Sequence, residues 1–329
     1  MVRRALLAFS VAAFLASPVP ADDAVPSSNP NQPPPHTLPF PNLATGESRE
    51  EARASLALGP QMQRGLSAAE ILDQRRRLDA ELAKLQPQRP GTVDAFVLSI
   101  ALDSDPVFAR EAREAGRVLA RRYDGAGRTL TLAGPDGQRN DLPQGSIDAL
   151  ILSLAKIAEV MDTEEDVLVM YSTSHGLDLG LAYHYGDTGY GILSPQRFAS
   201  VLEELGIEKR LLILSACFSG VFVPELASTD TAILTAAAGN RTSFGCEAEN
   251  DWTFFGDAMI NRALRKPQSL QEASQEANRS VATWESERRL LASLPQTSIG
   301  DGALGWLADL EARMPQTATE PVGRPANSD

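Results

Sequence analysis

The sequence predicts an α/β protein, a three-layer α/β/α sandwich around a mostly parallel sheet of about six strands. Two observations predict it. Short apolar runs rich in Val, Ile and Leu alternate along the chain with longer segments of helical periodicity. The strands recur roughly every 25–40 residues, which is the spacing of parallel strands joined by crossover helices.

Five apolar runs supply the parallel strands, and a shorter segment is suited to join them at an edge. Each run is four to nine residues long and ends at polar or small residues, as expected for strands covered on both faces. The predicted strands are 93–101, 128–132, 166–171, 211–214 and 231–237, with 295–299 at the edge.

Helices are predicted between the strands from capping residues and apolar stripes. Ser67 and Glu70 form a capping box, so a helix begins there. Asp105 is interpreted as the cap of a second helix, with Pro106 in its first turn. One face of the first helix carries Ile71, Leu78, Leu82 and Leu85. Further helices are expected at 146–160, 194–205, 252–264 and 269–291, and a short hairpin at 179–185.

Both ends of the chain are predicted to lie outside the folded domain. Residues 1–21 are typical of a secretory signal, with Arg3 and Arg4 before an apolar run and a cleavage site near Ala21. We therefore expect an exported protein, periplasmic or secreted. Residues 22–65 are a proline-rich, largely disordered leader in which His36 has no chemical role. Residues 66–312 form the domain, 313–329 are a disordered tail, and no segment of the mature chain is predicted to span a membrane.

Composition excludes several classes of function. The net charge of −13 and the absence of a basic stripe argue against nucleic-acid binding. The three histidines, His36, His175 and His184, are few and scattered, and no His-Glu-x-x-His motif occurs. We expect no metal and no cofactor, and the sequence leaves the oligomeric state open.

The most informative residues are His175 and Cys217, because each follows a predicted strand. Chemistry in a parallel α/β sheet gathers at the carboxyl ends of the strands, so these two side chains are expected to meet there. An imidazole beside a thiol favours the nucleophilic thiolate. The backbone amides of Gly176 and Cys217 are natural donors to an oxyanion. Three alternatives stay open at this point: a structural cysteine, a histidine bound to a local carbonyl, and a disulfide between Cys217 and Cys246.

Three motifs resemble the legumain family of caspase-fold cysteine peptidases, which includes asparaginyl endopeptidases. They are Ser174-His-Gly176, Ser215-Ala-Cys-Phe-Ser-Gly220, and the block 235–246 followed by Thr253-Phe-Phe-Gly-Asp257. The resemblance implies a caspase-like fold, His175 as general base and Cys217 as nucleophile, here in an exported bacterial member. It also places the pocket for the residue before the scissile bond at Ser215, Thr242, Ser243 and Asp257.

The resulting hypothesis is a cysteine endopeptidase that cleaves peptide or protein substrates through an acyl-enzyme. A transamidase or peptide ligase that uses the same acyl-enzyme is an alternative. A catalytically degraded peptide-binding protein is another, because the family has a glutamate in place of Ser215 and an Arg-His pair where this chain has residues 102–105. Both cysteines are expected to be free, since a bridge would close the substrate pocket predicted between them.

Overall fold

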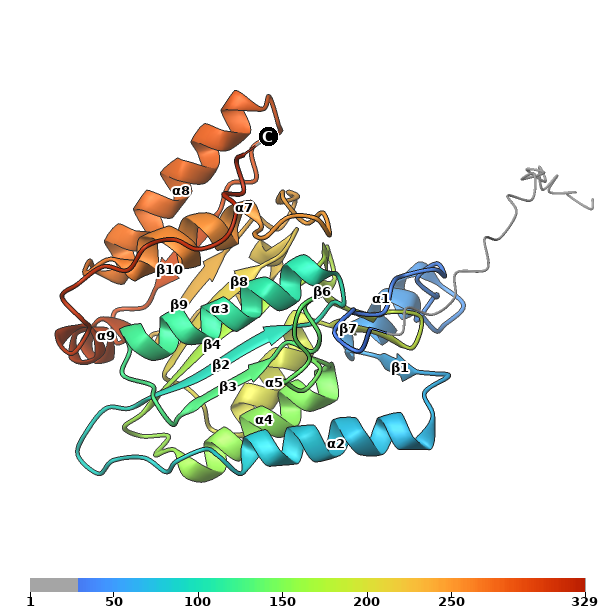
Figure 1. Ribbon diagram of the computed structural model, residues 1–329, viewed down its shortest axis with the longest axis horizontal. Coiled ribbons are helices and arrows are strands. Elements are labelled where there is room, and N and C mark those ends of the chain that lie inside the picture. Colours follow the sequence, from blue (N-terminus) through green and yellow to red (C-terminus); the bar gives the residue numbers. More distant parts are fainter. Residues whose placement is uncertain (1–28, 329) are drawn as a thin grey trace, which may run out of the picture.

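The computed structural model describes residues 29–328, and its centre is a six-stranded sheet (Figure 1). The strands are β2 (Ala95–Ala101), β3 (Thr129–Leu132), β4 (Val167–Thr173), β8 (Arg210–Ser215), β9 (Thr231–Thr235) and β10 (Gln296–Ile299). They lie in the order β10-β9-β8-β4-β2-β3. All neighbours are parallel except β10, which is antiparallel at the edge. The predicted fold class, including the late edge strand, is confirmed.

Helices cover both faces of this sheet. They are α2 (Ala68–Leu82), α3 (Pro106–Arg122), α4 (Ile147–Val160), α5 (Pro195–Glu204), α8 (Leu270–Glu287) and α9 (Ala303–Ala312). Successive side chains of β2 point to opposite faces of the sheet and pack in different apolar clusters. Val97 belongs to the cluster that includes residues of α3, α8 and α9. Leu98 belongs to the cluster that includes residues of α4 and α5. In Figure 1, α3 accordingly crosses the face of the sheet opposite α4 and α5.

A second, smaller sheet stands at the carboxyl edge of the first. It consists of β1 (Gln61–Gln63), β7 (Gly189–Leu193), β6 (Gly180–Tyr185) and β5 (Gly176–Leu177), in that order and all antiparallel. The predicted hairpin at 179–185 corresponds to β6. Its partner β7 was not predicted, because Gly189 and Gly191 weaken the strand pattern.

Two helical segments differ from the predictions. The capping box of Ser67 and Glu70 is present, but α2 lies at the rim of the domain, so Ile71 is 53% exposed although Leu78 is buried. The predicted helix at 252–264 is helical but irregular: α7 (Phe254–Gly256), the π-helical η2 (Asp257–Arg262) and the 3₁₀ turn η3 (Ala263–Arg265). After β8 the chain forms only η1 (Ser219–Phe222) and the short α6 (Val223–Leu226).

The described parts of the leader and the tail contact the domain, in contrast to the predicted disorder. Residues 29–65 include α1 (Arg49–Ala57) and β1, and the backbone of β1 pairs with β7. In the tail, the Val322 carbonyl accepts a hydrogen bond from Trp252 Nε1 and the Ala326 amide donates to Asp257. Composition alone predicted disorder because these segments are polar, yet a few long-range backbone bonds fix them. The predicted signal at 1–21 lies outside the described residues.

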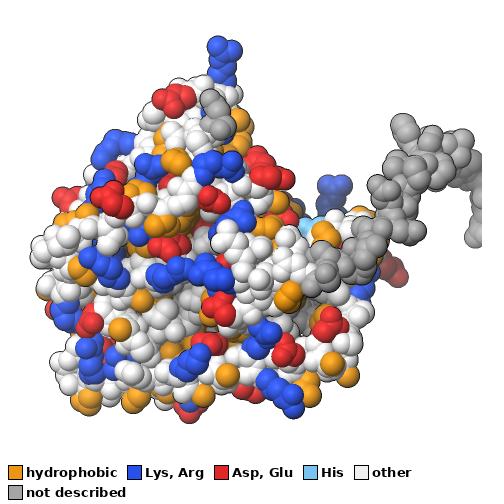
Figure 2. All heavy atoms as spheres, viewed as in Figure 1, with side chains coloured by type: hydrophobic (Ala, Val, Ile, Leu, Met, Phe, Trp, Pro, Cys, Tyr) orange, Lys and Arg blue, Asp and Glu red, His pale blue; other side chains and the backbone are white. Residues whose placement is uncertain are grey.

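The surface is mixed in charge. Figure 2 shows Lys and Arg interspersed with Asp and Glu over the visible face. Within residues 29–328, every helix is too short or too polar to cross a membrane.

Candidate active site

The loops that follow β4 and β8 touch each other at the carboxyl edge of the sheet. These strands are parallel neighbours, with Thr173 opposite Ser215, and the Ser174 amide donates to the Ser215 carbonyl at 3.3 Å. A Cβ at Gly176 would collide with the carbonyl oxygen of Cys217. Glycine at 176 therefore allows the two loops to pack backbone against backbone, and the histidine and cysteine at their tips become neighbours.

The Cys217 side chain is half-buried and bound to the loop that carries Ser243. The Ser243 amide donates to Cys217 Sγ at 3.2 Å, and the Ser243 hydroxyl lies 3.6 Å from the same sulfur. The next residue, Phe218, has a φ of 56°, a left-handed conformation that is uncommon for an aromatic residue. Its amide is held by the Arg241 carbonyl at 2.8 Å. The Cys217 turn is thus fixed from its C-terminal side.

This environment favours the thiolate of Cys217. A hydrogen bond from the Cys246 thiol lowers the pKa of Cys217, with further help from Ser243 and His175, to about 6 despite partial burial. The same interaction, together with burial, raises the pKa of Cys246 well above its ordinary value. Both cysteines are free, as predicted. The opposite pKa shifts show that the two thiols lie close enough to interact.

The His175 ring is held on two sides. Its Nε2 lies 3.3 Å from Asp105 Oδ2, and the Phe108 ring meets it edge to face at 5.0 Å between centroids. Burial lowers the pKa of His175, but Asp105, Asp103 and Cys217 outweigh that effect, and the net shift is upward. The hydrogen bond with His175 in turn lowers the pKa of Asp105.

Asp105 is the site residue whose role the sequence reasoning missed. It precedes α3, as predicted, but its side chain makes no capping hydrogen bond and turns instead to His175. The only signal in the sequence was its place just after the predicted strand 93–101, at the edge where the other chemical groups were expected.

The three histidines are gathered, not scattered as predicted. His36 and His184 stack at 3.5 Å between ring centroids, next to Asp103 and Asp105, and His175 lies on the other side of Asp105. Two groups of donors are close enough to hold a metal ion: His36, Asp103 and His184, or Asp103, Asp105 and His175. Burial raises the pKa of Asp103 to about 6, against the opposing effect of His175 and His36, and burial lowers that of His184 to about 4.

The structure brings only some of the predicted pocket residues to the cysteine. Ser243 contacts Cys217, and Thr242 beside it is exposed. Ser215 is 2% exposed and pairs with the Thr253 hydroxyl at 3.1 Å. Asp257 is fully buried, and its oxygens are bound by Asn261, Arg262 and the Ala326 amide. Asp257 is therefore engaged in the core of the domain and does not face the dyad.

Behind the site, Glu111 of α3 joins the elements that support it. This carboxylate is buried and accepts hydrogen bonds from the hydroxyls of Tyr171 and Thr173 and from the Thr253 amide. Burial raises the pKa of Glu111 despite these donors. Glu111 thus connects β4, which leads to His175, with the segment that packs against Ser215.

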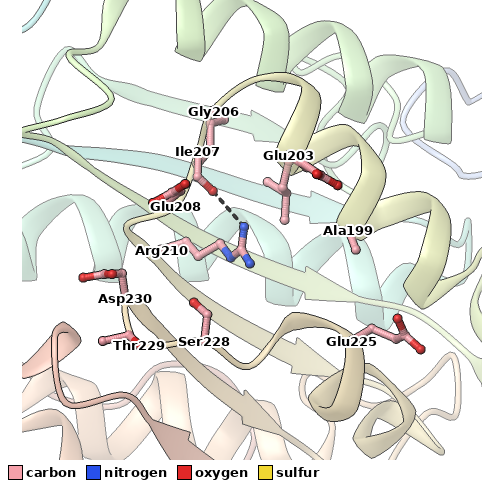
Figure 3. Close-up of a pocket in the computed structure, with 11 residues that line it drawn as sticks. Ala199, Glu203, Gly206, Ile207, Glu208, Arg210, Glu225, Ser228, Thr229 and Asp230 are labelled. Atoms are coloured by element: carbon pink, nitrogen blue, oxygen red, sulfur yellow. Dashed lines mark hydrogen bonds between the residues drawn. The ribbon is translucent and has the colours of Figure 1, made fainter.

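A separate hollow of about 450 Å³ lies at the opposite end of the sheet (Figure 3). It opens at the amino ends of β8 and β9, where Arg210 donates to the carbonyls of Ile207 and Leu226. Acidic side chains surround it: Glu203, Glu208, Glu225 and Asp230. Since parallel sheets carry their chemistry at the carboxyl ends of the strands, this hollow is distinct from the dyad.

Comparison with known proteins supports the family resemblance. Residues 145–305 match the Peptidase C13 family, a range that contains both His175 and Cys217. This confirms the resemblance to the legumain family and supports a function of the cysteine peptidase type. Among curated proteins no sequence matches the chain.

Two solved structures are similar at low identity. The crystal structure of caspase-1 from Spodoptera frugiperda has 14% identity and a TM-score of 0.43, and the match covers 65% of this chain and 88% of that one. The structure of pro-sf-caspase-1 has 13% identity and a TM-score of 0.41, with 64% and 92% covered. The fold class itself follows from the strand order described above.

Proposed function

Because residues 145–305 match the Peptidase C13 family, we propose that the protein is a cysteine endopeptidase that uses Cys217 as nucleophile and His175 as base. One observation carries the proposal. Two adjoining loops bring together a thiol with a lowered pKa and an imidazole that is oriented by the carboxylate of Asp105. A structural cysteine needs neither of these features.

The first half-reaction forms the acyl-enzyme. With Nε2 donating to Asp105, the neutral His175 ring keeps Nδ1 as the acceptor for the Cys217 proton. The sulfur attacks the carbonyl carbon of the scissile bond, and the amides of Gly176 and Cys217 donate to the oxyanion. When the C–N bond breaks, the protonated His175 gives its proton to the leaving amine, and a thioester remains on Cys217.

The second half-reaction releases the acyl group. His175 removes a proton from water, the hydroxyl oxygen attacks the thioester carbon, and the C–S bond breaks to free a carboxylic acid and Cys217. Asp105 keeps the ring in one tautomer and stabilises the imidazolium in both steps, so it is a positioning residue.

The substrate preference of legumain is not carried over. Ser215 and Asp257 are buried and occupied by other side chains, and the end of β2 carries the carboxylates of Asp103 and Asp105. The accessible wall beside Cys217 is the loop of Thr242 and Ser243. We therefore propose cleavage of peptides without the asparaginyl preference of that family.

Labelling with a thiol-reactive peptidyl electrophile tests the proposal. We expect the native protein to react at Cys217 faster than free cysteine, and Cys217→Ala, which keeps Cys246, to lose the label. His175→Ala tests the base in the same assay. Labelling no faster than that of free cysteine would favour a degraded peptide-binding protein. Product masses with added amines separate hydrolysis from transamidation.

A further inference from the structure

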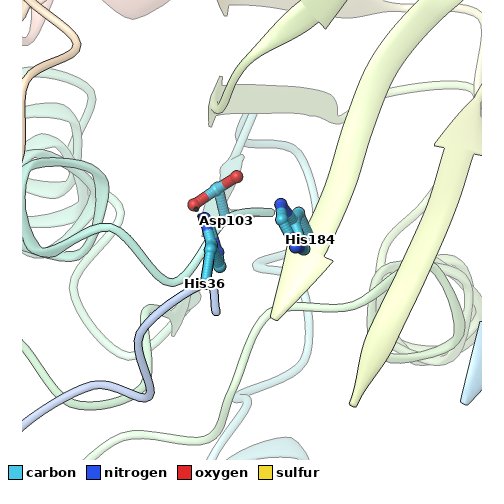
Figure 4. A group of neighbouring side chains, drawn as sticks. All are labelled: His36, Asp103 and His184. Carbon is cyan, nitrogen blue, oxygen red and sulfur yellow. Dashed lines mark ion pairs between the residues drawn. The ribbon is translucent and has the colours of Figure 1, made fainter. Parts of the chain in front are cut away.

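Three donor side chains from distant parts of the chain converge beside the dyad. His36 comes from the N-terminal coil, Asp103 follows β2 and His184 belongs to β6 (Figure 4). One donor atom from each lies within 4.8 Å of the others. We propose that His36, Asp103 and His184 bind a divalent transition-metal ion such as Zn²⁺, which ties the N-terminal segment to the edge of the sheet.

Asp103 and His184 are held in place by their backbones. They form a bridge pair, in which the His184 amide donates to the Leu102 carbonyl and the Ser104 amide donates to the His184 carbonyl, both at 2.9 Å. Two of the three donors therefore sit on hydrogen-bonded backbone, as a pre-organised site requires.

Both of these side chains keep a buried polar atom without a protein partner. Asp103 is 3% exposed, and its Oδ2 has no hydrogen-bond partner among the described residues. The same holds for His184 Nε2. An unsatisfied buried acceptor costs about 1–3 kcal/mol, so such atoms are uncommon unless a ligand or ion uses them.

The third donor arrives on a segment that is fastened on both sides of it. Before His36, the Pro34 carbonyl accepts a hydrogen bond from Ser104 Oγ, and after it the amides of Thr37 and Leu38 donate to Asp187. His36 Nε2 lies 2.9 Å from Ser104 Oγ and 3.5 Å from Asp103 Oδ1. Ser104 donates its hydroxyl proton to the Pro34 carbonyl, so His36 Nε2 must be the donor in its hydrogen bond with Ser104. To bind a metal ion through this nitrogen, His36 must first lose that proton.

Two imidazoles and one carboxylate suit zinc. Zn–N and Zn–O bonds of about 2.0–2.2 Å require donor atoms roughly 3.4 Å apart in a tetrahedral site. The donors, which lie within 4.8 Å of one another, must therefore close in by at most about 1.4 Å, and one ring must turn out of the stack, whose planes now differ by 11°. The other donor group, which contains His175, is less suitable because His175 is already paired with Asp105.

Metal titration of the full chain tests the proposal. The Cys217→Ala protein, cleared of metal with a chelator, is titrated with Zn²⁺ by calorimetry and with Co²⁺ by visible absorption. We expect one ion per chain and a d–d spectrum without thiolate charge transfer. His36→Ala and His184→Ala should each weaken binding at least tenfold, since even outer-shell changes cost about 10–100-fold.

His175→Ala serves as the matched control, because it removes the third histidine and leaves the proposed ligands. It should bind Zn²⁺ within about twofold of its parent. Loss of binding in His175→Ala, unchanged binding in His36→Ala, or no binding by the parent protein would each overturn the site. Circular dichroism confirms that each variant is folded. Since the parent lacks the nucleophile, the result is independent of the proposed peptidase activity.

Discussion

The two thiols of this chain lie side by side and have opposite properties. Cys217, at the end of β8, accepts hydrogen bonds from the Cys246 thiol and the Ser243 amide, and the charge of His175 adds a favourable electrostatic effect. The Cys246 thiol donates a hydrogen bond to Cys217, and Cys246 packs against an apolar cluster that includes Val107 and Phe108. The pKa of Cys217 falls to about 6, whereas that of Cys246 rises.

This difference shows that position at the sheet edge alone does not activate a thiol. Both cysteines are partly buried, and burial opposes the thiolate in each. What separates them is the hydrogen bond that they share, in which the Cys246 thiol donates and the Cys217 sulfur accepts, together with the Ser243 amide that donates to Cys217. The nucleophile is therefore defined by its donors.

The largest expected difference is in kcat/KM between the variants that remove one thiol or the other. Cys217→Ala should lower kcat/KM for a mixed peptide library by about 10³-fold or more, since a nucleophile has no substitute. Cys246→Ala should keep the reaction, with a loss of about tenfold or less, because it removes only one of the donors. Equal losses in the two variants would contradict the assignment of Cys217 as the nucleophile.

The next largest expected difference is in the pH at which each thiol becomes reactive toward alkylation. The rate of carboxamidomethylation of Cys217 should rise with a midpoint near pH 6, because the thiolate forms above its pKa of about 6. Cys246 should stay unlabelled until the pH exceeds the ordinary thiol value of ~8.5. Peptide mass spectrometry assigns each label. In Cys246→Ala the midpoint of Cys217 should move upward, and an unchanged midpoint would show that Cys246 is not the donor.

The sequence was sufficient for the sheet and for the placement of the loops of His175 and Cys217 at one edge of it, because both depend on local patterns. Apolar runs located the strands, and the residues directly after two of them proved to be neighbours. The partners of those residues come from elsewhere in the chain and carry no local signal. Asp105 is 70 positions from His175, and the cap position before Pro106 gave its carboxylate a simpler explanation.

The N-terminal segment shows the same limit more strongly. Its composition predicted disorder, and no periodicity marks His36. The segment is fixed by single contacts, such as the bonds from Thr37 and Leu38 to Asp187 and the stack on His184. Contacts of this kind depend on the completed fold, so a pattern within the segment cannot predict them.

A smaller effect is expected from Asp105→Asn, which changes the surroundings of His175 and Cys217 and leaves those of Cys246 unchanged. The amide keeps the shape but loses the charge that raises the pKa of His175. We expect kcat to fall about tenfold or more with little change in KM, because a hydrogen bond to a charged group contributes about 1.5–3 kcal/mol and a wrongly oriented ring affects the chemical step. The pH profile should shift with it, since the pKa of His175 drops. A change in KM alone would indicate a role in substrate binding.

The smallest effect concerns Cys246 as a packing residue. Cys246→Ala should lower the free energy of unfolding by about 1 kcal/mol, because a half-buried sulfur leaves the cluster of Val107 and Phe108. Gln271→Ala, at an exposed position of α8, is a control expected within about 0.5 kcal/mol of the parent.

The loss of unfolding free energy in Cys246→Ala should also depend on pH, and the pKa of Cys217 determines whether the loss grows or shrinks as the pH rises. The folded pKa of Cys217, about 6, lies below the ordinary thiol value of ~8.5, so its stabilising contribution is present above ~8.5 and lost as the pH falls through 6. Urea unfolding at about pH 5 therefore reports packing alone. At about pH 8 the variant should lose more, because the hydrogen bond to the thiolate is gone as well. An equal loss at both values would mean that the two thiols share no such bond.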